Sequence, residues 1–374
     1  MSKENIPYHV PFPTHHLGLE FVKEVLLSGK TAGNQIHSEA CKKILPPNFH
    51  GEQKFLTTSC TSALEFSALL ASVEPGDHVI LPSYTFPSTA NAFLLRGATL
   101  SFVDSMPNSP NMDLDAVEEL ISSKTKVLCV MHYAGISLDW EKIKALKATY
   151  NLTIIEDAAQ CIDAYYVNND IDYPLGSLGD FGAISFHETK NISCGEGGLL
   201  LVNNQEYIEK AEMMYEKGTN RASFLRKESA FYEWKSIGSS YTLSEINAAI
   251  LHGQLLQKSE INKMRQAIWN SYNLAFENIS VPYVPSYAKH NAHIFYLQLA
   301  SNSESVEFIK YMQKKRIQTL RHYRPLHSSS FFNDKHDGRI LKNAQHFSDT
   351  LVRLPIHQEV NVNRVIETAL DFFN

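Results

Sequence analysis

The stretch GDFGAISFHETKNISCGEGG, residues 179–198, decides how the rest of this chain is interpreted. It starts with an apolar run, becomes polar around Lys190, ends in glycines, and is followed by a second apolar run at residues 199–202. This pattern predicts two strands with a single lysine held in the turn between them. A lysine amine can form a Schiff base with a carbonyl compound such as pyridoxal phosphate. A solvated turn lysine is an equally good interpretation of this stretch alone.

Length and composition indicate an ordinary globular enzyme. The chain has 374 residues, which is enough for a large core and for two domains. Hydrophobic residues make up 44% and charged residues 20%, and the net charge of −6 gives no reason to expect nucleic acid as a partner. No apolar run is long enough for a membrane helix, and residues 1–16 lack the apolar core of a secretion signal. We therefore expect a cytoplasmic protein that does not contact membranes.

The cysteines give no sign of a metal site or a disulfide framework. They are odd in number, widely spaced, and form no C-x-x-C pair, and the chain contains no H-E-x-x-H motif. We expect no bound metal and a reducing compartment. The five residues are Cys41, Cys60, Cys129, Cys161 and Cys194.

Short apolar runs alternate with amphipathic helical patterns from residue 53 to residue 155. This rhythm predicts a mainly parallel sheet covered by helices on both faces, with ligands bound at the carboxyl ends of the strands. The expected strands are 53–57, 78–81, 99–103, 127–132 and 152–155, and the expected helices are 62–73, 88–95, 114–122 and 140–150.

The remaining segments predict fewer elements in a mixed order. Residues 1–50 are expected to be irregular apart from one helix at 19–28. The last hundred residues predict a smaller α+β domain. Including the helices that precede this domain, we expect helices at 206–217, 243–278, 305–315 and 364–373. The expected strands are 294–299 and 316–323.

Three loops at predicted strand ends contain candidate ligand groups. Hydroxyls at 57–62 precede a helix and either bind phosphate or cap the helix. Aromatic rings at 82–89 either stack on a planar cofactor or belong to the core. A carboxylate at 156–160 either pairs with a protonated pyridine nitrogen or caps a short helix, and chemistry alone does not choose between Glu156 and Asp157. Further on, residues 321–327 (RHYRPLH) either bind an anionic substrate or form a surface turn.

Motifs over nearly the whole chain resemble a known family. The sequence is similar to the DegT/DnrJ-type sugar aminotransferases, and especially to dTDP-4-amino-4,6-dideoxygalactose transaminases of the WecE/RffA type. The first resemblance rests on TSCTSALE (58–65), PGDHVILPSYTFPSTANAF (75–93), IIEDAAQ (154–160), FHETKN (186–191) and GEGG (195–198). The second rests on FHETKN, EKGTNR (216–221), IGSSY (237–241), NAHIFY (291–296) and HYRPLH (322–327).

The resemblance implies the fold type I of pyridoxal-phosphate enzymes. That fold is α/β, with a large, mainly parallel sheet domain covered by helices and a smaller C-terminal α+β domain. We expect the large cofactor-binding domain, with its N-terminal arm, at residues 1–252 and the small domain at residues 253–374.

The same resemblance assigns roles around pyridoxal 5′-phosphate. Lys190 matches the Schiff-base lysine, and Asp157 rather than Glu156 matches the acid that faces the pyridine nitrogen. Gln160 matches a position near the ring hydroxyl, and Phe86 the aromatic residue that stacks on the ring. The phosphate contacts are expected from Cys60, Thr61 and Ser185.

Further matches concern the partner subunit and the substrate. Ser240 stands where many members of the family have an asparagine that reaches the neighbouring subunit's phosphate. His322, Tyr323 and His327 are the candidate substrate-binding residues. The resemblance also implies a homodimer whose active sites are completed by both subunits.

The implied reaction is a transamination with L-glutamate as donor and 2-oxoglutarate as the released keto acid. The acceptor would be C4 of a dTDP-4-keto-6-deoxy sugar, dTDP-4-dehydro-6-deoxy-D-glucose, and the product dTDP-4-amino-4,6-dideoxy-D-galactose. Alternatives are the gluco epimer and a C3 amino sugar. Related sugar dehydratases carry histidine in place of Lys190, and a regulatory protein that retains the cofactor fold without catalysis is the alternative from another class.

Overall fold

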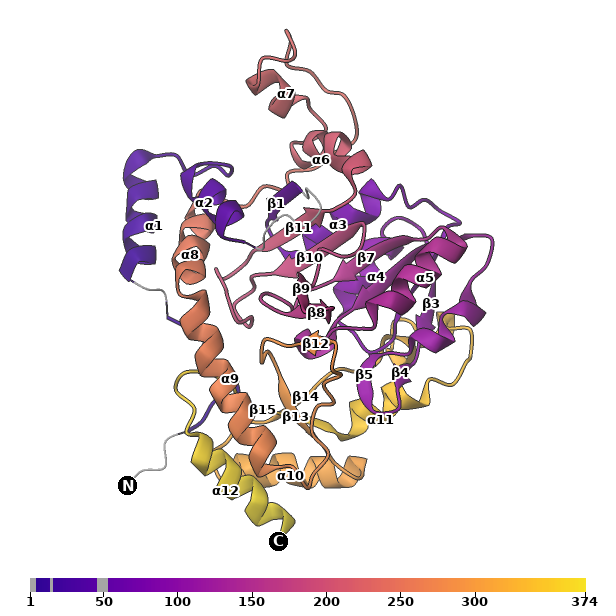
Figure 1. Ribbon diagram of the computed structural model, residues 1–374, viewed down its shortest axis with the longest axis vertical. Coiled ribbons are helices and arrows are strands. Elements are labelled where there is room, and N and C mark those ends of the chain that lie inside the picture. Colours follow the sequence, from indigo (N-terminus) through magenta and orange to yellow (C-terminus); the bar gives the residue numbers. More distant parts are fainter. Residues whose placement is uncertain (1–4, 14–15, 46–52) are drawn as a thin grey trace.

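The computed structural model describes residues 5–13, 16–45 and 53–374 (Figure 1). Its centre is a seven-stranded sheet. The strands lie in the order β1 (Gln53–Thr57), β11 (Gly198–Val202), β10 (Phe181–Ser185), β7 (Thr153–Asp157), β6 (Thr125–Met131), β2 (His78–Pro82) and β3 (Thr99–Val103).

The large sheet is mainly parallel, as the sequence predicts. Strand β11 pairs antiparallel with both β1 and β10, and the other neighbouring pairs are parallel. The β10–β11 pairing places Ser185 opposite Gly198, so Lys190 lies in the loop that joins these two strands. Since β11 alone runs in the opposite direction, the carboxyl ends of the other six strands lie at one edge of the sheet.

Both faces of the sheet are buried. Strand side chains alternate between the faces: in β2, Val79 and Leu81 belong to one hydrophobic cluster, and Ile80 belongs to a second. The first cluster includes residues of α3 (Cys60–Leu70) and α4 (Pro87–Leu94). The second includes residues of α2 (Ile36–Ile44), α5 (Trp140–Tyr150) and α8 (Glu245–Leu256). Helices therefore cover both faces, which explains the nearly continuous apolar character of the strands.

Around a third hydrophobic cluster, the C-terminal part of the chain forms a smaller sheet. It has the antiparallel order β13 (Phe295–Gln298), β15 (Leu351–Leu354), β14 (Leu320–Arg321). Helix α9 (Lys258–Ala275) follows α8 after Gln257, and the two run along one side of the molecule (Figure 1). The expected boundary between residues 252 and 253 lies within α8, and the division into two domains stays a prediction. The helices of this part are α10 (Asn302–Lys314), α11 (Lys342–Thr350) and α12 (Val362–Phe373).

Some sequence-based expectations are wrong. Residues 114–122 form two short 3₁₀ turns at Leu114–Ala116 and Glu118–Leu120 instead of one helix. Of the residues in this segment only Leu114 and Val117 are buried, and their spacing of three suits a 3₁₀ turn. The expected strand 316–323 is reduced to β14. Residues 36–44 were expected to be irregular and form α2, while residues 1–4, 14–15 and 46–50 of that expectation lie outside the described residues.

The remaining elements are short or peripheral. They are α1 (His16–Ser28), α6 (Ile208–Tyr215), α7 (Arg221–Leu225), β4 (Ser105–Met106), β5 (Ser109–Met112), β8 (Tyr165–Asn168), β9 (Ile171–Pro174) and β12 (Ala288–Lys289).

Within the described ranges, no helix combines the length and the apolar character that crossing a membrane requires.

Candidate active site

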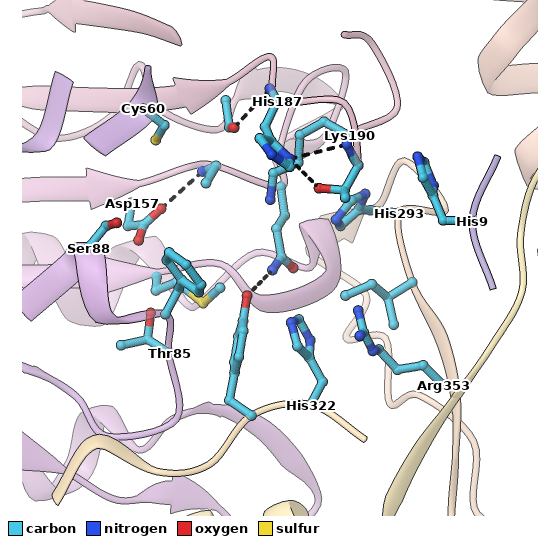
Figure 2. A pocket seen from close by; sticks show the side chains of 18 of the residues that line it. His9, Cys60, Thr85, Ser88, Asp157, His187, Lys190, His293, His322 and Arg353 are labelled. Carbon is cyan, nitrogen blue, oxygen red and sulfur yellow. Dashed lines mark hydrogen bonds between the residues drawn. The ribbon is translucent and has the colours of Figure 1, made fainter. Parts of the chain in front are cut away.

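A cavity of about 680 Å³ opens at the carboxyl edge of the large sheet (Figure 2). The ends of several parallel strands line it on one side, and residues of β14 and β15 line it on the other. This is where ligands bind in sheets of this kind. Seven of the sequence-predicted cofactor residues line it: Cys60, Thr61, Phe86, Asp157, Gln160, Ser185 and Lys190.

Lys190 lies in a loop held by hydrogen bonds on both sides. Its backbone N–H donates to the carbonyl of His187 at 2.9 Å. The next residue, Asn191, donates from its amide to the carbonyl of Asn291 at 2.9 Å, and its Oδ1 lies 2.8 Å from Nδ1 of His293. The loop is thus fixed to a segment about a hundred residues further along the chain, and the amine is directed into the cavity.

Desolvation in the cavity lowers the pKa of the Lys190 amine from its ordinary value of 10.5. The negative charge of Asp157 acts in the opposite direction. The shift increases the fraction of neutral amine at neutral pH, and the neutral form is the one that acts as a nucleophile or accepts a proton.

Asp157 ends β7 and points into the cavity. Its Oδ2 accepts a hydrogen bond from Thr89 Oγ1 at 2.6 Å, and its Oδ1 accepts one from the Ala159 N–H at 3.1 Å. Burial raises the pKa of this carboxyl above its usual 3.8, although the two hydrogen bonds and the charge of Lys190 oppose the shift. Among the described residues Asp157 has no ion-pair partner. A bound cation would stabilise its ionised form.

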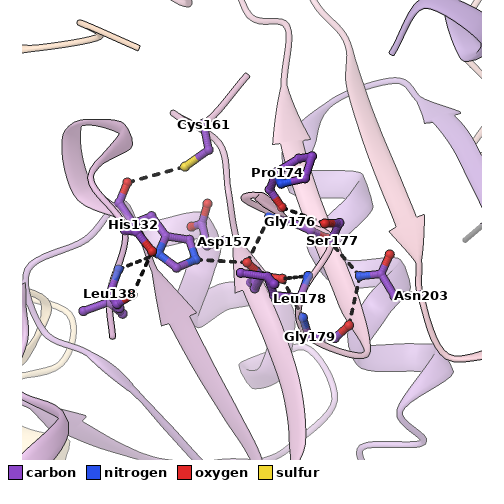
Figure 3. A network of polar contacts seen from close by, with 12 residues as sticks. His132, Leu138, Asp157, Cys161, Pro174, Gly176, Ser177, Leu178, Gly179 and Asn203 are labelled. Carbon is purple, nitrogen blue, oxygen red and sulfur yellow. Dashed lines mark hydrogen bonds and ion pairs between the residues drawn. The ribbon is translucent and has the colours of Figure 1, made fainter. Parts of the chain in front are cut away.

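Glu156 points to the other face of β7 and does not line the cavity. It accepts hydrogen bonds from three backbone N–H groups, and its Oε2 lies 3.0 Å from Nε2 of His132 (Figure 3). Of the two neighbouring acids, only Asp157 is therefore available to a ligand in the cavity. The three N–H donors belong to Gly176, Leu178 and Gly179, at 2.8, 2.7 and 2.6 Å.

The start of α3 forms one end of the cavity. Ser59 caps the helix by accepting a hydrogen bond from the Ser62 N–H at 3.0 Å. The first helical N–H groups, those of Cys60 and Thr61, have no acceptor within the helix and can bind an anion. A Cβ at Gly198 would lie 2.4 Å from the carbonyl carbon of Ser59, so glycine is required where β11 meets this loop. Capping and anion binding, which the sequence left as alternatives, are both possible because different residues provide them.

Three further hydroxyl groups lie near this end. Thr61 Oγ1 is 2.8 Å from Ser88 Oγ. Ser185 ends β10 and is buried, and its Oγ accepts a hydrogen bond from the His187 N–H at 3.3 Å. Together with the start of α3, these groups form a site suited to a phosphate.

The aromatic residues after β2 divide into core and cavity positions. Tyr84 is buried, with 1% of its surface exposed, and belongs to the hydrophobic core. Phe86 precedes α4, lines the cavity and is 55% exposed. The core interpretation therefore holds for Tyr84, whereas Phe86 offers its ring to a ligand.

Gln160 connects the cofactor side of the cavity to residues 322–324, the HYR segment. Its Oε1 accepts a hydrogen bond from the Ala134 N–H at 2.6 Å, and its Nε2 donates to the hydroxyl of Tyr323 at 3.2 Å. His322 Nδ1 lies 3.1 Å from the Tyr133 hydroxyl, and burial lowers the pKa of this histidine well below its usual value. His322 and Tyr323 line the cavity, so this part of the segment is not a surface turn.

Two sequence-predicted residues lie away from the cavity. His327 does not line it, and its Nδ1 is 2.6 Å from Ser83 Oγ. Ser240 is exposed and forms an isolated bridge with Glu216, the residue that follows α6. Its place among the cofactor-binding residues stays a prediction.

Several cavity residues were missed by sequence reasoning. Some of them stand inside the motifs quoted above, which did not assign them a role, and the others stand outside every motif. Arg353, for example, stands alone in the strand LVRL. In the part of the chain that the structure describes, no group of three or more metal-ligating side chains is found. The missed residues include Tyr8, His9, Ser88, His187, Arg265, His293 and Arg353.

Comparison with known proteins shows a family match over most of the chain. The model of the DegT/DnrJ/EryC1/StrS aminotransferase family matches residues 32–369. The spore coat polysaccharide biosynthesis protein SpsC of Bacillus subtilis is 30% identical over 330 residues, which are 84% of this chain and 83% of SpsC.

Solved structures show the same fold. The aminotransferase TlmJ of Streptoalloteichus hindustanus superposes with a TM-score of 0.88 at 25% identity, over 99% of both chains. The PLP form of Spr1654 from Streptococcus pneumoniae gives a TM-score of 0.87 at 23% identity, over 99% of this chain and 98% of that one. These comparisons confirm the fold type I architecture and pyridoxal phosphate as the cofactor.

Proposed function

Because this chain belongs to the DegT/DnrJ/EryC1/StrS aminotransferase family, we propose that it transfers the amino group of L-glutamate to C4 of dTDP-4-keto-6-deoxy-D-glucose. The products are 2-oxoglutarate and dTDP-4-amino-4,6-dideoxy-D-galactose. The observation that carries the proposal is the placement of Lys190 and Asp157 in one cavity, where the charge of each affects the pKa of the other.

The residues of the cavity fit pyridoxal phosphate. The N–H groups at the start of α3 and the hydroxyl of Ser185 suit the phosphate. Asp157 has no ion-pair partner among the described residues, and the protonated pyridine nitrogen would provide one. The exposed ring of Phe86 is available for stacking. When bound, this cofactor acts as an electron sink for the bond that is broken at the substrate carbon.

Lys190 performs the proton transfers in this proposal. Its Nζ would hold the cofactor by its carbonyl carbon. When it is free and neutral, the same amine would accept the proton from the α-carbon of glutamate and give a proton to C4 of the sugar. Desolvation favours the neutral amine that this role requires.

Two observations support a nucleotide sugar as the acceptor. SpsC, a relative at 30% identity, is named for polysaccharide biosynthesis, which requires activated sugars. The HYR segment, on which the resemblance to the dTDP-sugar transaminases partly depends, lines the cavity through His322 and Tyr323. The gluco epimer and a C3 amino sugar are the alternative products on the same scaffold. His327 does not line the cavity, and its part in substrate binding stays a prediction.

The proposal includes a homodimer in the cytoplasm, with active sites completed by both subunits. Exposed large apolar side chains gather in two places, on α1 and the start of α2 and in the segment that follows α7, and exposed apolar groups of this kind mark protein interfaces. Ser240 lies at the end of the second group. The side chains are Leu17, Leu19, Leu26, Leu27, Ile36, Phe231, Tyr232, Trp234 and Ile237.

The test is incubation of the cofactor-loaded protein with L-glutamate and dTDP-4-keto-6-deoxyglucose. We expect an amino sugar whose proton NMR couplings show an axial nitrogen at C4. An equatorial nitrogen would assign the gluco epimer, and a C3 amine the third alternative. No amino sugar together with unchanged glutamate would contradict the proposed function.

A further inference from the structure

Two histidines meet where the N-terminal helix α1 packs against α2 and α8 (Figure 1). His37 lies on α2 and His252 on α8, and their Nδ1 atoms are 3.1 Å apart. Phe21 of α1 stacks on the His252 ring, with the ring centres 4.6 Å apart, and its centre lies 4.9 Å from that of His37. These three rings, the histidine corner, therefore join three helices that are separate in the sequence.

Helix α1 buries few of its side chains. Of its residues, all within the described range 16–45, only Gly18 and Val25 are buried. A Cβ at Gly253 of α8 would lie 2.7 Å from the Cα of Gly18, so the two helices approach closely there. A separate helix of 13 residues is only marginally stable in water. The helix therefore depends on a small number of contacts with its neighbours, and the histidine corner supplies two aromatic ones.

The hydrogen bond between the two histidines limits how many protons they can hold. One Nδ1 donates, and the other must be unprotonated in order to accept. The bond is therefore compatible with no more than one protonated imidazole. With both rings protonated, two positive charges would face each other at 3.1 Å in a part-buried site, where like charges repel strongly.

Two carboxylates face the pair. Glu24 of α1 has its Oε2 3.9 Å from His37 Nε2, an atom that is buried and has no hydrogen-bond partner in the described part of the chain. Glu245 of α8 already accepts hydrogen bonds from the start of α2. On α2 itself, Glu39 and Lys42 pair with each other at 2.9 Å. One positive charge on His37 can therefore be compensated by Glu24, whereas a second charge at the corner has no free partner.

The second proton is the one that the folded chain disfavours. Burial and the neighbouring His37 lower the pKa of His252 below its ordinary value of 6.5, and the charge of Glu245 opposes the shift. When α1 is released, water reaches this ring and its pKa returns toward the ordinary value. The released state then binds more protons than the docked state below pH 6.5. Docking is therefore strongest above pH 6.5 and weakens as the pH falls from 6.5 toward the lowered pKa.

We propose that the histidine corner is a pH-sensitive contact that holds α1 on α8 at neutral pH and releases it in mild acid. The helix carries the exposed side chains of Leu19, Leu26 and Leu27, which are among those assigned above to the contact with a second copy of the chain. Release of α1 should therefore also weaken the dimer. This consequence rests on the proposed homodimer, whereas the release of the helix does not.

The test is amide hydrogen exchange of the cofactor-loaded protein at pH 7.5 and pH 5.5, expressed as protection factors to remove the intrinsic pH dependence of exchange. In the wild type, protection of α1 should fall on the order of tenfold at pH 5.5, while that of the central sheet is maintained. His252→Phe keeps an aromatic ring against Phe21 and cannot be protonated. Its α1 protection should be equal at the two pH values.

Two further variants complete the experiment. His346→Gln is the matched control, because His346 is exposed on α11, away from the corner, and this variant should keep the wild-type pH dependence. Glu24→Gln changes a side chain that is 68% exposed, so the fold should persist. Since the first proton on His37 is then uncompensated, the loss of α1 protection should begin at a higher pH.

Three results would overturn the inference. They are equal α1 protection of the wild type at both pH values, the same loss in His252→Phe as in the wild type, and an unshifted loss in Glu24→Gln.

Sedimentation velocity at the same two pH values separates this inference from the proposed homodimer. We expect a weaker dimer at pH 5.5 in the wild type and an unchanged one in His252→Phe. If α1 protection falls while the dimer is unaffected, the pH-sensitive contact is supported and the assignment of α1 to the dimer interface is wrong.

Discussion

Two neighbouring carboxylates on β7 show how one strand serves both the fold and the site. Glu156 and Asp157 point to opposite faces because strand side chains alternate. Glu156 accepts three backbone hydrogen bonds and contacts His132, so its bonding is complete within the chain. From the residues that the structure describes, Asp157 accepts only two hydrogen bonds, and burial raises its pKa. The comparison indicates that a saturated buried charge holds segments together, whereas an incompletely satisfied one is available to a ligand.

The two cavity arginines follow the same rule. Arg265 uses its donors on backbone carbonyls, and Arg353 keeps a buried donor without an acceptor. Hydrogen-bond completeness therefore separates Glu156 and Arg265 from Asp157 and Arg353, whereas burial does not, since all four residues are at least partly buried.

Replacement of Lys190 is expected to have the largest effect on activity. Lys190→Ala removes both the covalent attachment and the proton-transferring amine, so kcat should fall by about 10⁴-fold or more. The fold should persist, because the loop is held by backbone groups and by Asn191. Activity is measured by release of 2-oxoglutarate, and the fold by circular dichroism.

Lys210 supplies the matched control for that experiment. Burial also lowers its pKa, but it lies on α6 and donates to Leu70 O and Ser72 Oγ, outside the cavity. Lys210→Ala should keep wild-type kcat. If Lys190→Ala retained appreciable transamination, the assignment of this lysine would be wrong.

Asp157→Asn is expected to have the next largest effect. The amide keeps the shape and cannot balance a positive charge on the ring nitrogen, so kcat should fall by about 10²–10³-fold, as when a stabilising group in a preorganised site is removed. The melting temperature of the cofactor-free protein should be maintained. A variant with full activity would mean that the carboxylate does not face the cofactor.

The sequence predicts much of the fold and part of the site, for reasons that differ. The strands of residues 53–155 are predicted well because both sheet faces are buried and the runs are strongly apolar. The residues alone left the choice between Glu156 and Asp157 open, because it depends on which face each side chain meets. Only the family resemblance favoured Asp157. The sequence-based strand ended at Ile155, while β7 continues to Asp157.

Local sequence patterns do not predict which residues from distant segments reach the cavity. His293 and Arg353 lie more than a hundred residues after Lys190 and reach the cavity through the packing of the small sheet against the large one. A lone arginine in an apolar strand carries no periodic signal, and only its unpaired Nε in the folded chain distinguishes it.

Glu156→Gln tests the structural role of the first of the two carboxylates on β7. It should lower the stability of the protein and leave catalysis unchanged. The amide group places N–H donors against backbone N–H donors, leaving at least one group unsatisfied. We expect a loss of about 1–3 kcal/mol in the free energy of unfolding, with kcat of the folded protein close to that of the wild type. Denaturant titration gives the first quantity. A large loss of kcat without loss of stability would show that the two carboxylates do not divide their roles in this way.

The smallest expected effect is a pH dependence that arises from Asp157. Because its pKa in the folded protein is raised above the ordinary value of 3.8, the folded state binds more protons than the unfolded state between the two values. The stability of the cofactor-free protein should therefore decrease as the pH rises from 3.8 through the raised pKa. Asp157→Asn lacks this group, so the stability difference between variant and wild type should change in favour of the variant over this pH range and then level off. Denaturant titrations from pH 4 to pH 7 measure the difference. Loading with pyridoxal phosphate should reduce it, because the carboxylate then faces a positive charge, whereas a difference independent of both pH and cofactor would contradict an unpaired carboxylate at this position.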